Sequence, residues 1–402
     1  MKKLFALLLV LVMMVAIAGC ATEEAAPSTG GETKTEAKTE AAKTEAAKTE
    51  AEKHVFMFKS TGNLFGDLMY RGFEEAVTSL GGVAEYVSPA ETTAAAQVQL
   101  VEELINQGVS SITISANDGD AFNAIAKLAE SKGVKLLSAD SAINPAVRTS
   151  HTIPTTIDGV GRHLVYAAIM ILAEVPYEEG MDMSAKTNEI LKADTFKADP
   201  IKVGILSATT TSPVQNLWIA SMEKELAMLA EMYPGNILDA NESKDDSMLD
   251  IKYGNDDPQD SVTQANAFIS EDAVDVIVAP TTVGMFAGGQ QLVNNPDSKI
   301  KLTGLGLPSE MANFMPTSAA NEFDAVCPYM MLWNVIDLGA VSGAAAVASV
   351  AGTYDGSVGS SFDYDGTTYE AIADPDSDGA VIVVGNPFVF YQGNMEVWKE
   401  TL

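Results

Sequence analysis

Polar residues gather directly after several short apolar runs of the sequence, where their side chains could bind a ligand. Most of them carry hydroxyl or amide groups, and Lys59 and Asp140 add one positive and one negative charge. Such a set donates and accepts hydrogen bonds, which suits a neutral polyhydroxylated ligand. The segments in these positions are 59–63, 117–118, 140–141, 209–215 and 280–282.

Individual side chains in these segments suggest separate roles in holding such a ligand. Asp140 can accept two vicinal hydroxyl protons at once, and Lys59 can donate to a third oxygen. Phe65, Trp218 and Trp333 can offer flat apolar faces to the C–H groups of a sugar ring, although core packing on a helix is an equal alternative for Trp218. Substitution of Asp140 by alanine is expected to abolish ligand binding and to leave melting of the free protein nearly unchanged.

The elements that must position these residues alternate between strand and helix with short loops, which favours parallel sheets with right-handed crossovers. Ligands bind such sheets beyond the carboxyl ends of the strands. The first half predicts strands at 54–58, 83–87, 111–115 and 135–139, and helices at 64–80, 92–107 and 120–131. The second half predicts strands at 201–206, 237–238, 274–279 and 301–305, and helices at 214–232, 260–270 and 283–294.

The remaining segments connect and complete these two halves. A helix over 158–175 bridges them, and the polar segment 176–200 is typical of a surface insertion. The tail predicts a long helix of small residues at 332–351 and a hairpin at 361–370. Short strands at 381–384 and 388–390 then return to the two earlier sheets. The fold class is therefore α/β, with two doubly wound lobes.

Several catalytic and metal-binding classes find no support in the residues. The chain lacks the G-x-S-x-G, H-E-x-x-H and G-x-x-x-x-G-K-[ST] motifs. Two cysteines and three histidines exclude a disulfide scaffold and a Cys/His zinc cluster. Cys327 lies in an apolar segment predicted as a strand and is expected to be an inert buried thiol. His163 is expected to be structural. We predict no enzyme and no cofactor.

The net charge excludes another class of partner. The chain has 55 acidic and 24 basic residues, a formal charge of -31. This excess repels phosphate backbones, so nucleic-acid binding is not expected.

The start of the chain predicts export and attachment to a membrane. Residues 1–19 combine a basic start with a short apolar run, as in a signal peptide. The Ile-Ala-Gly-Cys ending resembles the lipobox of bacterial lipoproteins, which implies cleavage before Cys20 and lipidation of its thiol. An ordinary signal peptide with an incidental cysteine is the alternative. Residues 20–53 repeat Lys, Thr, Glu and Ala, which predicts a solvated tether.

One acidic turn is a weak calcium candidate. Asp374, Asp376 and Asp378, followed by Gly379, match the first half of a calcium loop. The twelfth position is Gly385 and not glutamate, so the bidentate ligand is missing. A solvated acidic turn is the favoured alternative, and we predict no metal site.

Residues 54–402 resemble the periplasmic sugar-binding proteins of ABC transporters with the ribose-binding type of fold, and most of all the rhamnose- and autoinducer-2-binding branch. The order and spacing of several stretches together carry the resemblance. They are Phe58-Lys-Ser-Thr-Gly-Asn63, Gln97 to Gly108, Ser115-Ala-Asn, Leu137-Ser-Ala-Asp-Ser141, Gln215-Asn-Leu-Trp218, Ile277-Val-Ala-Pro280, Leu332 to Gly339 and Gly385 to Phe390 with Asn394.

The resemblance implies two lobes joined by three crossovers, with the ligand between them. The first lobe would comprise 54–157 plus 334–378, and the second 158–333 plus 379–402. The family's binding residues fall on Lys59, Asp140, Gln215, Pro280 and Thr282. The autoinducer-2 binders carry an acidic residue directly before that glutamine, where this chain has Val214. A deoxysugar such as rhamnose, or another pentose or hexose, is therefore favoured. Together with the residue-level candidates, the expected ligand-binding set is Lys59, Phe65, Asn117, Asp140, Gln215, Pro280, Thr282, Trp333 and Asn334.

The expected function is capture of a neutral sugar by a monomeric lipoprotein, which delivers it to the permease subunits of an ABC importer at the cell envelope. The only membrane contact would be the lipid anchor, on the outer face of the cytoplasmic membrane or in the periplasm. One alternative is a sensor of the same fold that reports an autoinducer-2-like ligand to a chemoreceptor. Another is a surface-anchored sugar hydrolase, which needs two carboxylates facing across the cleft. Only Asp140 is expected there.

Overall fold

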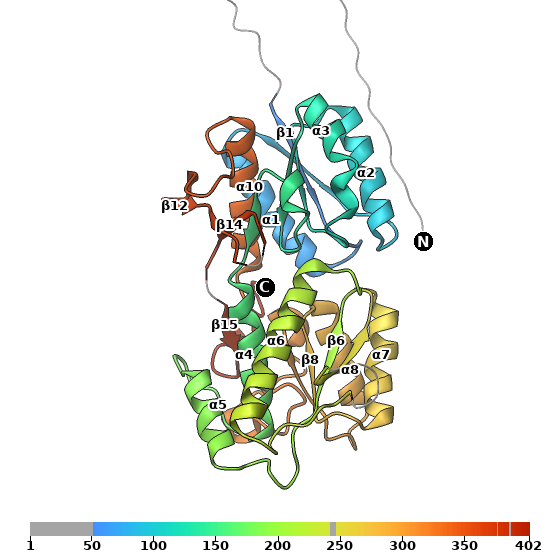
Figure 1. Ribbon diagram of the computed structural model, residues 1–402, viewed down its shortest axis with the longest axis vertical. Coiled ribbons are helices and arrows are strands. Elements are labelled where there is room, and N and C mark those ends of the chain that lie inside the picture. Colours follow the sequence, from blue (N-terminus) through green and yellow to red (C-terminus); the bar gives the residue numbers. More distant parts are fainter. Residues whose placement is uncertain (1–50, 242–246, 376, 386) are drawn as a thin grey trace, which may run out of the picture. The chain divides into compact units, whose positions relative to one another are not determined.

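The computed structural model describes residues 51–241, 247–375, 377–385 and 387–402, which belong to one compact unit, Glu50–Leu402 (Figure 1). The predicted signal peptide, Cys20 and nearly all of the predicted tether lie outside the described residues. Within the described ranges, no helix is long and apolar enough to cross a membrane.

A seven-stranded sheet organises the first lobe, in the order β13-β14-β5-β4-β3-β1-β2. Neighbouring strands are parallel except for the antiparallel pair β13–β14. The interior strand β3 is buried along its whole length, as expected where helices cover both faces. The strands are β1 (Lys53–Met57), β2 (Val83–Val87), β3 (Ser111–Ile114), β4 (Lys135–Ala139), β5 (His151–Ile153), β13 (Ile372–Ala373) and β14 (Ala380–Val383).

Helices cover both faces of this sheet because successive side chains of a strand point to opposite faces. Val55 and Met57 of β1 pack in one core with α2 (Ala94–Gln107) and α3 (Ala126–Lys132). Phe56 packs in the other core with α1 (Leu64–Ser79) and α10 (Val335–Val350), and Figure 1 shows the two helix pairs on either side of β1. Two short 3-10 helices, η1 (Ala121–Asn123) and η2 (Pro145–Val147), complete this lobe.

Helices α1 and α10 touch through their backbones, which explains the small residues of α10. A Cβ added at Gly72 would lie 1.9 Å from the carbonyl oxygen of Ile336. One added at Gly339 would lie 1.8 Å from the carbonyl oxygen of Met69. Only glycine allows this approach at the two positions.

A four-stranded parallel sheet, β7-β6-β8-β9, organises the second lobe. Its strands are β6 (Val203–Ser207), β7 (Leu249–Tyr253), β8 (Val276–Ala279) and β9 (Lys301–Gly304). Its helices are α4 (Ile157–Leu172), α5 (Met183–Lys192), α6 (Pro213–Met232), α7 (Pro258–Glu271), α8 (Thr282–Asn294) and α9 (Pro308–Met311), with the 3-10 helix η3 (Ala319–Asn321). Helices α4 and α6 lie on one side of this sheet and α7 and α8 on the other (Figure 1). The predicted fold class, two parallel-sheet α/β lobes, is confirmed.

The tail serves both lobes. Strand β10 (Met330–Leu332) extends the second sheet through a bridge between Leu305 and Met331, and it pairs with β15 (Phe388–Phe390). The chain then returns through α10, the hairpin β11 (Ser361–Tyr364) and β12 (Thr367–Glu370), and β14 to the first lobe. From β14 it crosses once more to β15 and the final helix α11 (Met395–Trp398). With the passage from β5 to α4, these are the three predicted crossovers.

The predicted lobe boundary at residue 379 differs from the sheet pairing. The resemblance implies that residues 379–402 belong to the second lobe, but β14 pairs in parallel with β5 of the first sheet, with Ile382 opposite Thr152. The physical reason is burial, because Val381 and Ile382 lose almost all solvent contact in this sheet. Only β15 and the residues after it join the second lobe.

Four local predictions were wrong. The segment 237–238 forms a single bridge, Ile201 to Ile237, and the second strand of that sheet is β7. The predicted helix 120–131 is divided into η1 and α3. The segment 176–200 is more than a surface insertion, because its helix α5 buries Ile190 and Leu191. The segment around Cys327 forms no strand before Met330.

Candidate ligand-binding site

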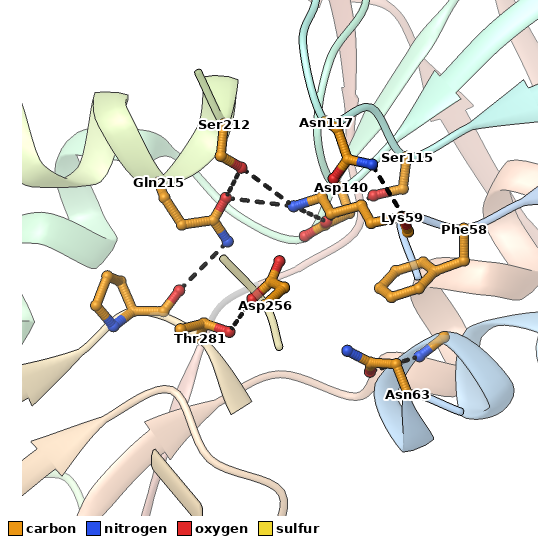
Figure 2. Close-up of polar contacts among 12 residues, drawn as sticks. Phe58, Lys59, Asn63, Ser115, Asn117, Asp140, Ser212, Gln215, Asp256 and Thr281 are labelled. Atoms are coloured by element: carbon orange, nitrogen blue, oxygen red, sulfur yellow. Dashed lines mark hydrogen bonds and ion pairs between the residues drawn. The ribbon is translucent and has the colours of Figure 1, made fainter. Parts of the chain in front are cut away.

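A small cavity lies where the carboxyl ends of β1 and β4 face the start of α6 and the end of β8, as expected for parallel sheets. Its volume is about 30 Å³. Seven of the nine predicted ligand-binding residues line it: Lys59, Phe65, Asp140, Gln215, Pro280, Thr282 and Trp333. Figure 2 shows the polar contacts of this region.

A buried ion pair forms the first lobe's part of the site. The Lys59 Nζ lies 3.4 Å from the Asp140 Oδ2, and the two side chains are 3% and 5% exposed. Ser115 Oγ donates to the same carboxylate oxygen at 2.9 Å. Asp140 adopts a left-handed φ of 63°, an uncommon backbone state that a non-glycine residue keeps only where the surroundings impose it. The turn after β4 thus aims a charge-compensated carboxylate into the cavity.

The Gln215 side chain connects this ion pair to the second lobe. Lys59 Nζ donates to Gln215 Oε1 at 3.2 Å, and Ser212 Oγ donates to the same oxygen at 2.5 Å. The amide nitrogen of Gln215 donates to the Pro280 carbonyl oxygen at 3.3 Å (Figure 2). The amide is therefore oriented from both ends, and Lys59 bonds to groups of both lobes at once.

Aromatic rings form an apolar wall beside these polar groups. The rings of Phe65 and Trp333 meet edge to face, with centroids 6.3 Å apart, and Trp218 lies 5.7 Å from Trp333. Trp218 is only 2% exposed, so it packs in the core and also lines the cavity. The indole N–H groups of Trp218 and Trp333 are buried, and neither has a hydrogen-bond acceptor among the described residues. Such a wall suits the apolar face of a ring.

Two of the predicted binding residues, Asn117 and Asn334, do not line the cavity. The side-chain amide of Asn117 donates to the Lys59 carbonyl oxygen at 3.0 Å, and its backbone N–H donates to Gln97 Oε1 at 2.8 Å. Asn117 therefore supports the loop that carries Lys59. Asn334 caps α10, because its side-chain oxygen accepts from the backbone N–H groups of Ile336 and Asp337.

Asp256 lines the cavity but lies in none of the predicted ligand-binding segments, whereas Asn63, which also lines it, lies in the predicted segment 59–63. Asn63 caps the start of α1. Asp256 follows β7, and Thr281 Oγ1 donates to its Oδ1 at 2.6 Å. A residue that follows a strand of a parallel sheet is a candidate for ligand binding, as in the other loops. The strand before Asp256, β7, was not predicted, so the sequence did not indicate this residue. Asp140 is thus not the only carboxylate in the cavity, contrary to the expectation.

A larger cavity of about 360 Å³ lies on the hinge side, bounded by loops of both lobes and by β14. Arg148 Nη1 donates to the Ile143 carbonyl oxygen at 2.8 Å and Nη2 lies 3.4 Å from Asp374. His151 shares a 3.0 Å hydrogen bond with Ser138, and burial lowers the pKa of His151 well below its usual value. The charge of Arg148 is thus compensated by Asp374. No Phe, Tyr or Trp is among the described residues that line this larger cavity.

Other singled-out residues have structural surroundings. Cys327 is a free, buried thiol, and burial raises its pKa. His163 shares a hydrogen bond of 2.6 Å with the carbonyl oxygen of Gly159 within α4. Of the weak calcium candidate, Asp374 lies beside Arg148 and accepts from Ser377, Asp378 is exposed, and Asp376 lies outside the described residues. Among the described residues, no three His, Cys, Asp or Glu side chains form a group that could hold a metal ion.

Comparison with solved structures finds the same fold. An ABC transporter solute-binding protein from Clostridium phytofermentas with bound L-rhamnose is 29% identical, covering 88% of this chain and 99% of that one, with a TM-score of 0.71. LsrB from Clostridium saccharobutylicum in complex with AI-2 is 22% identical, covering 86% and 99%, also with a TM-score of 0.71. A sugar ABC transporter protein from Actinomyces odontolyticus is 26% identical, covering 86% and 97%, with a TM-score of 0.57.

The family model for the periplasmic binding protein domain matches residues 54–353. This match includes the whole second sheet, the first sheet without β13 and β14, and every residue that lines the small cavity. The protein therefore belongs to the periplasmic binding protein family.

Proposed function

We propose that this protein captures a neutral sugar between its two lobes and delivers it to the permease of an ABC importer. The carrying observation is the buried Lys59–Asp140 pair, which meets Gln215 of the other lobe in a cavity walled by aromatic rings. A carboxylate and an ammonium group together accept from and donate to neighbouring hydroxyls, while the rings take the apolar face. The bound L-rhamnose of the structure from Clostridium phytofermentas supports this ligand class.

Binding then couples to the movement of the lobes. The cavity volume is only about 30 Å³, so the lobes must move apart to admit a monosaccharide before they close around it. In the complex the sugar replaces the direct hydrogen bond between Lys59 and Gln215 and bridges the same groups. Because only the closed state satisfies both ends of its hydroxyl set, the sugar stabilises closure. The permease recognises that state.

The other parts of the chain serve this delivery in the proposal. Cleavage after residue 19 and lipidation of Cys20 anchor the protein at the outer face of the cytoplasmic membrane. The segment 20–53 is the tether, which raises the concentration of the binder beside its permease. The protein acts as a monomer, and each lobe contributes one side of the site.

The second carboxylate in the cavity calls for a comparison with a sugar hydrolase. Hydrolysis needs one carboxyl group that gives a proton and one carboxylate that acts as base or nucleophile. Asp140 pairs with Lys59 and accepts a hydrogen bond from Ser115, and Asp256 accepts one from Thr281, so both carboxylates are arranged as hydrogen-bond acceptors. We therefore propose binding without catalysis.

Titration calorimetry tests the proposal. The protein is titrated with L-rhamnose, D-arabinose, D-fucose and AI-2, and the same titrations are made with Asp140→Ala and with Asp118→Asn. Asp118 lines the hinge-side cavity and not the small one, so its variant is the matched control. We expect at least one sugar to bind with 1:1 stoichiometry to the wild type and the control and not to Asp140→Ala. Absence of binding by all three sugars contradicts the proposal, and binding of AI-2 alone favours the sensor.

A further inference from the structure

Asp256 is held in an unusual backbone state that turns its side chain into the cavity. Asn255 and Asp256 both have left-handed φ values, 57° and 49°. The turn is fastened to β6 and the residue after it, because Gly254 N donates to the Ser207 carbonyl oxygen at 2.8 Å and Asn255 N to that of Ala208 at 3.1 Å. The Asp256 side chain, which Figure 2 shows beside Thr281, lines the cavity, and the residue is only 7% exposed.

This carboxylate differs from Asp140 in its compensation. Asp140 has Lys59 as a cation and Ser115 as a donor. Asp256 accepts from the Thr281 hydroxyl, and no described lysine, arginine or histidine forms an ion pair with it. A buried carboxylate without a cation destabilises the free protein. Hydrogen-bond donors of a bound molecule would offset that cost.

The charges of the residues around the cavity indicate which ligands could supply these hydrogen-bond donors. The described residues that line it carry one positive charge, on Lys59, and two negative charges, on Asp140 and Asp256. A carboxylate or phosphate on the ligand would therefore enter a field that is negative overall, and next to Asp256 no cation would compensate it. Hydroxyl groups instead donate to the free lone pairs of Asp256.

We infer that Asp256 is a specificity-determining residue, whose carboxylate accepts hydrogen bonds from sugar hydroxyls on the second-lobe side and excludes sugar acids and sugar phosphates. This inference rests on the proposed function and names the residue that makes its site select neutral sugars over acidic ones. Asp256 then lowers the stability of the sugar-free protein while it provides selectivity for neutral sugars.

The test is the variant Asp256→Asn. This substitution adds no backbone strain, since asparagine tolerates left-handed φ, and the amide oxygen can still accept from Thr281. Asp257→Asn is the matched control, because it removes the same charge one residue away, where the exposed side chain only caps α7. The probes are L-rhamnose and D-fucose as neutral sugars and D-galacturonate as the acid, all titrated by calorimetry. Asp256→Asn should bind the neutral sugars about tenfold or more weakly, and the preference for neutral sugar over acid should narrow by about tenfold.

Melting of the sugar-free protein provides the second measurement. If Asp256 serves binding, Asp256→Asn should melt at the same temperature as wild type or up to about 2 °C higher, because a buried uncompensated charge is removed. A clear drop in melting temperature would show a structural role and overturn the inference. Unchanged sugar affinity and selectivity in Asp256→Asn, with normal binding by wild type, would overturn the inference alone. No sugar binding by wild type would overturn the proposed function and the inference together.

Discussion

The two lobes bring different polar groups to the same cavity. On the first lobe, Asp140 is compensated by Lys59 and Ser115, so its charge is balanced without help from the other lobe. On the second lobe, Asp256 accepts a hydrogen bond from the Thr281 hydroxyl and has no cation beside it among the described residues, and Gln215 accepts a hydrogen bond from Lys59 of the first lobe. The first lobe is thus organised before a ligand arrives, whereas the second reaches full hydrogen bonding only against a ligand or the opposite lobe.

Among the variants considered, Asp140→Ala should have the largest effect on sugar binding and on stability. The variant should lose sugar binding by more than about 100-fold, because the main hydrogen-bond acceptor of the first lobe is gone. It should also lower the free energy of unfolding by about 3–5 kcal/mol, since Lys59 is left buried without its partner. This differs from the expectation of nearly unchanged melting, because the sequence did not reveal how deeply the pair is buried.

Denaturant unfolding of Asp140→Ala and of the double variant Lys59→Met/Asp140→Ala measures the two effects separately. The double variant removes the unpaired ammonium, so it should regain much of the lost stability and still fail to bind sugar. Equal stability of the wild type and Asp140→Ala would show that the ion pair is not buried in solution.

Gln215→Leu tests the second lobe with a smaller effect. It removes the amide between Lys59 and the Pro280 carbonyl oxygen, and sugar affinity should fall by about tenfold, or ~1.4 kcal/mol. The free protein should lose less stability than in Asp140→Ala, because Lys59 keeps its ion pair. Asn216→Ala is the control, since the side chain of this half-buried neighbour donates to the Thr210 carbonyl oxygen and does not line the cavity. If calorimetry gave equal sugar affinities for Gln215→Leu and Asn216→Ala, Gln215 would not be a binding residue.

Acid should also act on the first lobe, where two histidines lie in the sheet. Burial lowers the pKa of His54 in β1 and, more strongly, of His151 in β5. The unfolded chain therefore binds protons more readily, and stability that is fully present above about pH 6.5 is lost as the pH falls towards the lowered values. The loss approaches ~1.4 kcal/mol per pH unit for each histidine. Urea unfolding between pH 7.5 and 5 measures this loss. The free energy of unfolding should depend less steeply on pH in His151→Gln than in wild type or in the control His163→Gln. A wild-type free energy of unfolding that does not change with pH would contradict the prediction.

Much of the site could be predicted because parallel sheets bind ligands at one edge. Lys59, Asp140, Gln215 and Pro280 each follow a strand or begin a helix at that edge, and strands such as Val276–Ala279 are unmistakably apolar. Asp256 was missed because its strand, Leu-Asp-Ile-Lys-Tyr, alternates with charged residues and follows a polar stretch.

Other parts depend on contacts that local sequence does not contain. Asn117 and Asn334 have the chemistry of binding residues, but their amides hold the Lys59 loop and the start of α10. The sequence of β14 predicts an apolar strand with no sign of its partner, and only the pairing with β5 assigns it to the first lobe. Residue type and position along the chain therefore predict which loops form the site, and packing decides which side chains reach it.

A crystal structure of the protein grown with L-rhamnose or D-fucose tests the central claim most directly. The account predicts one sugar between the lobes, with hydroxyls on Asp140, Gln215 and Asp256 and with the Lys59–Gln215 hydrogen bond replaced by contacts to the sugar. Sugar density in the hinge-side cavity beside Arg148 and His151, with that hydrogen bond still in place, would contradict it.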